Sequence, residues 1–141
     1  TCAGALRGCI GSLVAERPLR ADVENNALAA AFSDPRFPPL SAREYREIEV
    51  EVSLLSPMQP VTMESETHAL TLLRPGVDGV LLEYGRRRGT FLPQVWEQLP
   101  EPHAFLAHLK QKAGLPADFW SEKIRLSRYT VTKWREIEQK V

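Results

Sequence analysis

Hydrophobic and polar residues alternate without interruption from Glu47 to Leu54. Side chains of a β-strand point to opposite faces in turn, so this period of two predicts a strand with one buried face and one wet face. We expect the buried face to consist of Ile48, Val50, Val52 and Leu54. The opposite face carries three glutamates. They could hold a cation only with ligands from other elements, so we interpret this face as facing solvent.

A second sheet signal lies between residues 80 and 92. Val80–Tyr84 and Gly89–Leu92 flank Gly85 and the run Arg86-Arg87-Arg88. Glycine tolerates the backbone angles of tight hairpin turns. The segment therefore predicts an antiparallel hairpin with the arginines at or near its tip.

Helical signals are interspersed with these strands. Asp22 is a candidate cap for a helix that runs to about Phe32, with a stripe of small apolar residues, and Asp34-Pro35 ends it. Ser41–Glu44 is a capping box that predicts one or two helical turns. A longer helix is predicted from Pro102, with Gly114 ending it and lysines in its last turn.

The remaining segments complete the expected architecture. Residues 58–68 are polar and predict a loop, and residues 69–73 predict a short strand or a turn of helix. The stretch from Ile124 to Val131 predicts strand, with a bulge or bend at Ser127-Arg128, where the alternation changes phase. Because the elements mix without a regular strand–helix–strand repeat, we predict an α+β fold with a mainly antiparallel sheet and flanking helices.

Size and charge limit the possible functions. The 141 residues are 43% hydrophobic and 26% charged, which fits one domain over residues 1–141 that buries a core without metal or disulfide. Eighteen basic and eighteen acidic residues give no net charge. A dedicated nucleic-acid binder usually carries a basic excess, so nucleic acid is an unlikely partner.

The cysteines and apolar runs bear on the compartment. Cys2 and Cys9 match neither a disulfide framework nor a zinc site, which favours a reducing environment. The apolar runs are far shorter than the ~20 residues that span a bilayer, so we expect no membrane insertion and a cytoplasmic location. Because the chain opens with Thr1, we expect that a native leader or N-terminal element is missing.

One string resembles a known family. Leu6-Arg7-Gly8-Cys9-Ile10-Gly11, named the signature segment below, resembles the signature of the AMMECR-type domain family, whose bacterial and archaeal members are called AmmeMemoRadiSam system protein A. The resemblance continues along almost the whole chain, in Ala29–Phe32, Asp34–Leu40, Ile48–Ser53, Arg74–Gly79, Gly89–Trp96 and Lys112–Pro116.

The resemblance implies an α+β fold with a larger and a smaller lobe. Family members usually carry a helix and a strand before the signature, which this chain lacks. The molecular activity of the family is not settled. Its system name implies Memo-type and radical-SAM proteins as partners, and such an association does not identify a reaction.

Cys9 is the candidate catalytic residue. Arg7 would lower the pKa of its thiol, and the backbone at Gly8 and Gly11 could stabilise an oxyanion. A nucleophilic cysteine also needs a base, and no histidine stands in a recognisable relation to Cys9. The competing interpretation is a small cysteine buried in a glycine-rich turn.

Other residues are weaker candidates. We assign ligand or partner binding to Arg7, Gly8, Ile10, Gly11 and Arg36, although Arg36 fits better as the ion-pair partner of Asp34 or of the acidic strand. His103 and His108 are five residues apart and do not share a helix face, so we predict no metal site. Three tryptophans are interpreted as core anchors, namely Trp96, Trp120 and Trp134.

Three functions remain open. We favour an interaction or accessory module that works with Memo-type and radical-SAM proteins, because no complete catalytic constellation is visible. The alternative is a small-molecule enzyme, or a component of one, that uses Cys9 and Arg7. The third is a nucleic-acid binder through Arg86–Arg88, for which we expect weak, salt-sensitive binding at most. The sequence identifies neither a substrate nor a cofactor.

Overall fold

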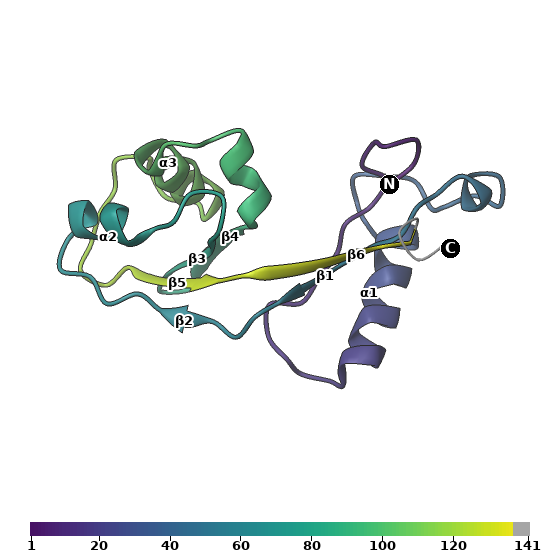
Figure 1. Ribbon diagram of the computed structural model, residues 1–141, viewed down its shortest axis with the longest axis horizontal. Coiled ribbons are helices and arrows are strands. Elements are labelled where there is room, and N and C mark those ends of the chain that lie inside the picture. The colour runs from purple at the N-terminus through teal and green to yellow at the C-terminus, as the bar shows by residue number, and fades with distance from the viewer. Residues whose placement is uncertain (137–141) are drawn as a thin grey trace. The chain divides into compact units, whose positions relative to one another are not determined.

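An antiparallel sheet with the strand order β2-β5-β3-β4 organises residues 55–132 (Figure 1). The computed structural model describes residues 1–136. The chain divides into unit 1, which holds Thr1–Leu54 and the chain from Lys133 onward, and unit 2, which holds Leu55–Thr132. The helices and antiparallel strands confirm the predicted α+β class. The sheet of unit 2 consists of β2 (Gln59–Pro60), β5 (Arg125–Tyr129), β3 (Gly79–Tyr84) and β4 (Arg87–Phe91).

The predicted hairpin is confirmed. Strands β3 and β4 pair antiparallel from Val80 opposite Phe91 to Tyr84 opposite Arg87. Gly85 turns the chain with a φ of 59°, a backbone angle that glycine adopts without strain. The arginines occupy the tip as expected, although the Arg87 guanidinium donates a hydrogen bond to the Gly114 carbonyl.

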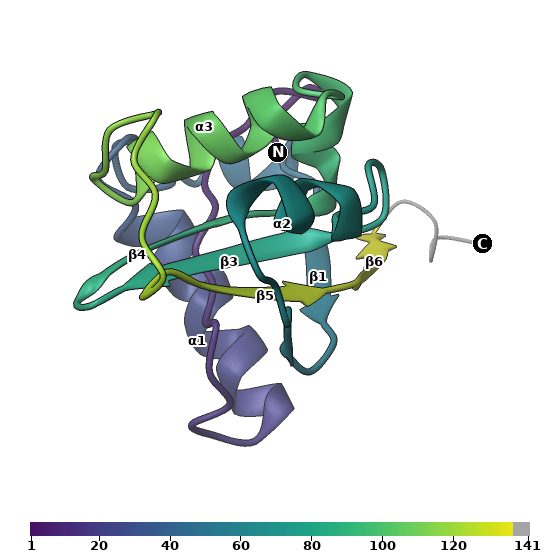
Figure 2. The ribbon, with the colours of Figure 1, turned by 90° about the vertical axis from the view of Figure 1, so that its left-hand side faces the viewer.

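One face of this sheet carries the core. Val80, Leu82 and Leu126 point to the same side and are buried there against α2 (Glu66–Leu72) and α3 (Pro102–Lys112) (Figure 2). Trp96, in the short helix η2 (Pro93–Glu97), stacks on Phe105 of α3 with ring centroids 3.7 Å apart. The prediction that Trp96 anchors the core is therefore confirmed.

The opposite face of β5 explains the change of phase in its sequence. The predicted bulge at Ser127-Arg128 is wrong, because the register with β3 runs unbroken from Arg125 to Tyr129. Leu126 and Tyr129 are both buried although they point to opposite faces, so the strand is apolar on both sides. The Tyr129 ring lies over Gly79, where a Cβ atom would come within 2.3 Å of it.

Both helices of unit 2 begin at side-chain caps. Glu101 accepts hydrogen bonds from two backbone N–H groups at the start of α3, and Gly114 follows its end with a φ of 84°, as the sequence predicts. Ser65 caps α2, which starts inside the stretch expected to be loop and settles residues 69–72 as helix. Lys110, expected in solvent at the end of α3, is instead buried and paired with Glu66.

Unit 1 contains one long helix among its described residues. Helix α1 runs from Leu19 to Phe32, three residues earlier than expected, because Pro18 occupies the position before its first turn. Asp22 lies inside that turn and accepts a hydrogen bond from the Ser12 hydroxyl at 2.9 Å. None of the helices within residues 1–136 is long and apolar enough to cross a membrane.

The capping box is confirmed, whereas the long alternating strand is not. Ser41 and Glu44 exchange hydrogen bonds before the short helix η1 (Glu44–Arg46). Strand β1 covers Glu51–Leu55 and pairs with β6 (Val131–Arg135) in a two-stranded sheet. Val50 and Leu54 are exposed, so the expected buried face is wrong. A two-stranded sheet has no wide apolar face to bury.

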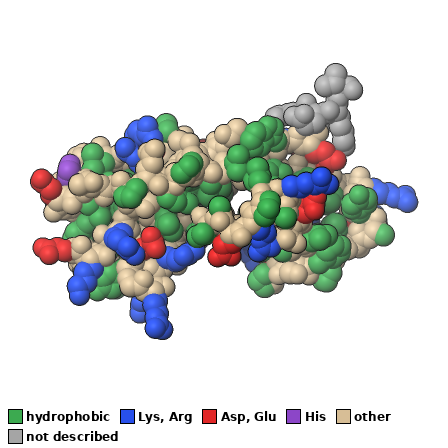
Figure 3. Space-filling view, turned by 90° about the horizontal axis from the view of Figure 1, so that it is seen from below, with side chains coloured by type: hydrophobic (Ala, Val, Ile, Leu, Met, Phe, Trp, Pro, Cys, Tyr) green, Lys and Arg blue, Asp and Glu red, His purple; other side chains and the backbone are tan. Residues whose placement is uncertain are grey.

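Unit 1 and unit 2 differ in how they treat apolar side chains. All the fully buried hydrophobic residues within residues 1–136 belong to unit 2. Large hydrophobic side chains that stay exposed in the described chain all belong to unit 1, with Val77 as the exception. Trp134 is one of them, which overturns its expected role in the core. On the face shown in Figure 3, hydrophobic side chains gather on the surface at the right of the view, where unit 1 lies.

Candidate functional site

The signature segment is irregular chain that lies against α1. Its expected strand–turn conformation is not found, because Leu6–Gly11 contains neither strand nor helix. A Cβ atom on Gly8 would lie 2.1 Å from the Ala30 carbonyl oxygen, so only glycine allows this approach to the helix backbone. Gly8 does not have the positive φ expected of it, and Gly11 faces open space. The two glycines therefore have different roles.

A buried carboxylate fixes the backbone of Cys9. Asp34 has 4% of its surface exposed, and its Oδ2 accepts a hydrogen bond from the Cys9 backbone N–H at 3.0 Å. Arg36 binds both oxygens of that carboxylate, with Nη2 2.7 Å from Oδ2 and Nε 3.0 Å from Oδ1. Arg36 Nη2 also donates to the Cys9 carbonyl at 3.3 Å. The predicted ion pair between Arg36 and Asp34 is confirmed.

A second ion pair fixes Arg7. Its Nε lies 2.8 Å from Glu44 Oε1, and its Nη2 donates to the Pro38 carbonyl at 2.8 Å. Nη1 is buried and has no hydrogen-bond partner among the described residues. Phe37 joins the two ion pairs, because the Arg7 and Arg36 guanidiniums lie 5.7 and 5.6 Å from its ring centroid.

These contacts set the pKa values of both carboxyl groups. The hydrogen bond from Arg36, followed by that from the Cys9 N–H, holds the pKa of Asp34 far below its usual value. The hydrogen bond from Arg7, followed by two from Ser41, lowers the pKa of Glu44 to about 2. Both carboxylates are therefore charged at neutral pH and bind the arginines in that form.

The Cys9 side chain is free while its backbone is fixed. Cys9 is exposed and Cys2 is half-buried, and both are free thiols. The interpretation of Cys9 as a buried packing residue is thus wrong. The three histidines of the sequence, His68, His103 and His108, all belong to unit 2. Within its own unit, Cys9 therefore has no imidazole to serve as a base.

Apolar side chains surround this framework. Leu6 and Ile10 of the signature segment are 51% and 38% exposed. A hollow of about 560 Å³ is lined by Phe32, Leu40, Tyr45 and their neighbours. Ser41 lines the same hollow and binds Glu44, so the hollow adjoins the Arg7 ion pair. Unit 1 thus combines a rigid polar framework with an apolar surface.

The other sequence candidates do not form a site with these residues. Arg86, Arg87 and Arg88 belong to unit 2. Glu51 of the acidic strand forms ion pairs with Lys133 and Arg135. Within residues 1–136, no group of three or more His, Cys, Asp or Glu side chains is placed to hold a metal ion.

Comparison with known proteins identifies the family. The sequence model of the AMMECR1 family matches residues 1–134. The chain belongs to the AMMECR1 family. It is 40% identical to a protein of Methanocaldococcus jannaschii, over 94% of this chain and 67% of that protein. It is 41% identical to a protein of Methanothermobacter thermautotrophicus, over 94% and 70% of the two chains.

A solved structure shows the same fold. The crystal structure of an uncharacterized protein from Pyrococcus horikoshii superposes with a TM-score of 0.86 at 32% sequence identity, over 96% of this chain and 70% of that one. The AMMECR1 chain described here thus spans 67 to 70% of the length of these three proteins.

Sequence reasoning missed the two carboxylates that organise this AMMECR1 site. Asp34 was considered as an ion-pair partner of Arg36, but its bond to the Cys9 N–H joins residues 25 positions apart. Glu44 was visible as the acidic member of a capping box, and its pairing with Arg7 spans 37 positions. The available signal was the string Asp34–Leu40, which contains Asp34 and Arg36 and also Phe37.

We expect acid to release the signature segment. Because the pKa of Glu44 lies at about 2 in the folded AMMECR1 chain and at the ordinary 4.5 when unpaired, its ion pair adds stability above pH 4.5. That contribution is lost as the pH falls from about 4.5 to 2. Thermal unfolding of the wild type and Glu44→Gln between pH 7 and pH 2 measures it. The two melting temperatures should converge in acid, and a constant difference would contradict the assignment.

Proposed function

We propose that this AMMECR1 chain is an interaction module that works beside Memo-type and radical-SAM partner proteins. The observation that carries the proposal is the concentration of exposed apolar side chains on unit 1 around the signature segment. Exposed apolar patches rimmed by polar residues are typical of protein–protein contact sites. Leu6, Ile10 and Phe32 are the contact residues that we assign first.

The state of the charged residues supports binding over catalysis. Arg7 and Arg36 are each held by a carboxylate, so neither guanidinium is free to receive an anionic substrate. The same ion pairs fix the backbone of the signature segment in one conformation. A contact surface that is rigid before binding loses less conformational entropy when a partner docks.

The experiment measures binding of the purified chain to purified Memo-type and radical-SAM proteins from the same genome, by biolayer interferometry. Ile10→Asp should weaken binding about thirtyfold or more, which is the usual effect of losing a central apolar contact. Val77→Asp is the matched control, because Val77 is similarly exposed but lies in unit 2.

Two outcomes would contradict the proposal. Neither partner protein binds the wild type, or Ile10→Asp and Val77→Asp weaken binding equally. Circular dichroism of each variant shows whether a lost interaction reflects lost folding. Since Ile10 is exposed, its substitution should leave the melting temperature close to that of the wild type.

One observation favours a second function. The exposed Cys9 thiol sits on a backbone that two hydrogen bonds hold in place, as a nucleophile would require. This would make the chain a small-molecule enzyme, or a component of one, that receives its base from elsewhere. The rate of Cys9 alkylation by iodoacetamide against pH tests it, since an activated thiol reacts well below pH 8.

A further inference from the structure

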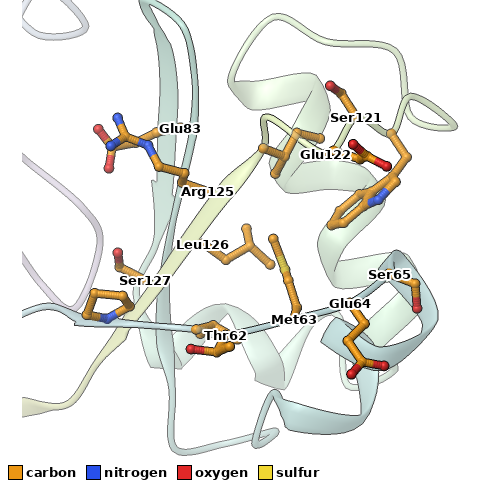
Figure 4. A pocket seen from close by; sticks show the side chains of 14 residues that line it. Thr62, Met63, Glu64, Ser65, Glu83, Ser121, Glu122, Arg125, Leu126 and Ser127 are labelled. Carbon is orange, nitrogen blue, oxygen red and sulfur yellow. The ribbon is translucent and has the colours of Figure 1, made fainter.

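A groove in unit 2 lies apart from the signature segment. It has a volume of about 640 Å³ and runs between residues 60–65, which lead from β2 to α2, and residues 120–127, which lead into β5. Figure 4 shows Met63 and Leu126 near its centre, with Glu64 and Ser65 on one side and Glu83 with Arg125 on the other. The proposed function uses none of these residues.

The centre of the groove is apolar. Ile124 and Leu126 are 3% and 2% exposed, so they belong to the core and form the floor. Met63 and Trp120 are half-buried and line the groove above them. Methionine adapts its shape to different apolar partners, and an indole offers a flat surface for stacking. The groove is therefore suited to a large apolar side chain.

The rim of the groove is acidic at one side. Glu64 and Glu122 both line it and are exposed, and neither carboxylate takes part in an ion pair with the described residues. Glu83 differs, because it stands opposite both Arg88 and Arg125 across neighbouring strands, and cross-strand opposite charges stabilise each other. The uncompensated charge therefore lies at Glu64 and Glu122.

We propose that this groove binds an extended segment of a partner protein in which a lysine or arginine adjoins a large apolar side chain. The apolar side chain occupies the centre over Leu126, between Met63 and Trp120. The cationic group lies beside Glu64 and Glu122, where it finds the two unpaired carboxylates.

A peptide fits the walls better than a compact molecule does. Backbone hydrogen bonding between β2 and β5 reaches Val61, whose N–H donates to the Leu126 carbonyl at 2.9 Å. Past that point the chain separates from β5, and the groove opens between the two segments. An extended segment can lie along this opening, as peptides lie beside the free edges of sheets.

The test uses synthetic pentapeptides, acetylated and amidated, and isothermal titration calorimetry. Gly-Lys-Phe-Lys-Gly should bind saturably, Gly-Glu-Phe-Glu-Gly should not bind, and Gly-Lys-Gly-Lys-Gly should bind at least about tenfold more weakly. The double variant Glu64→Gln/Glu122→Gln should bind the first peptide about fivefold more weakly, in line with two exposed charge contacts. Added salt should reduce the affinity of the wild type more than that of the variant.

The matched control is Glu16→Gln/Glu97→Gln, which removes the same charge at two exposed glutamates outside the groove. Equal affinity of both double variants overturns the proposal, as does absence of saturable binding or equal binding of the acidic peptide. Binding of phenylethylamine as tight as that of the peptide also overturns it, in favour of a small-molecule site. Because the test uses peptides and the purified chain, its outcome is independent of whether Memo-type or radical-SAM proteins bind unit 1.

Discussion

Replacing Phe105 by alanine is expected to lower the free energy of unfolding by about 3–5 kcal/mol, the largest effect of any substitution considered. Phe105 has 0% of its surface exposed. Its ring stacks on Trp96 and meets the edge of Phe91 with centroids 5.3 Å apart. Alanine removes both ring contacts and leaves a cavity that α3 and β4 cannot close without moving. Urea unfolding followed by circular dichroism measures the loss.

The matched control lies on α1 of unit 1. Leu28 is 61% exposed, so Leu28→Ala should change the free energy of unfolding by no more than about 0.5 kcal/mol. Phe105→Leu keeps most of the apolar volume and should fall between the two variants. A loss below about 1 kcal/mol for Phe105→Ala would show that stability does not depend on the core of unit 2.

Replacing Gly8 by alanine is expected to destabilise unit 1 by about 1–3 kcal/mol or more. The new Cβ atom would meet the Ala30 carbonyl oxygen at 2.1 Å and the carbonyl carbon at 2.9 Å. Both atoms belong to the backbone of α1 and cannot rotate away, so the signature segment must move off the helix. Hydrogen exchange of the Cys9 backbone N–H, which Asp34 protects in the wild type, should then become faster.

Gly11→Ala is the control for this prediction. A Cβ atom there meets nothing within 4 Å, and the φ of Gly11 is not positive. Alanine restricts the unfolded chain, so this variant should be as stable as the wild type or more stable by about 0.4–1 kcal/mol. The packing of Gly8 on α1 would be refuted if Gly8→Ala and Gly11→Ala had the same stability and the same exchange rate at Cys9.

Local sequence signals predicted the fold well. The hairpin around Gly85, the capping box at Ser41–Glu44 and the helix from Pro102 to Lys112 all depend on residues close together in the chain. The alternation from Glu47 to Leu54 predicted a strand but misplaced its environment. Alternation shows which side chains share a face, and burial of that face depends on another layer that the pattern does not specify.

The candidate site was predicted only in part, for the same reason. The pairing of Arg36 with Asp34 is local, and it was recognised. The pairing of Arg7 with Glu44 and the bond from the Cys9 N–H to Asp34 join distant segments, so the sequence did not reveal them. Exposure of Cys9 was also missed, because glycine neighbours indicate a tight turn without showing which side of it faces solvent.

The arrangement of the two units has a consequence for the order in which the nascent chain folds. Unit 2 is one continuous stretch, whereas unit 1 combines residues from before and after it, as in the hydrogen bond from the Glu136 N–H to the Val50 carbonyl. Domains generally fold as they emerge from the ribosome. Unit 2 can therefore complete its core during synthesis while residues 1–54 wait, and β1 acquires its partner strand only once β6 has left the exit tunnel.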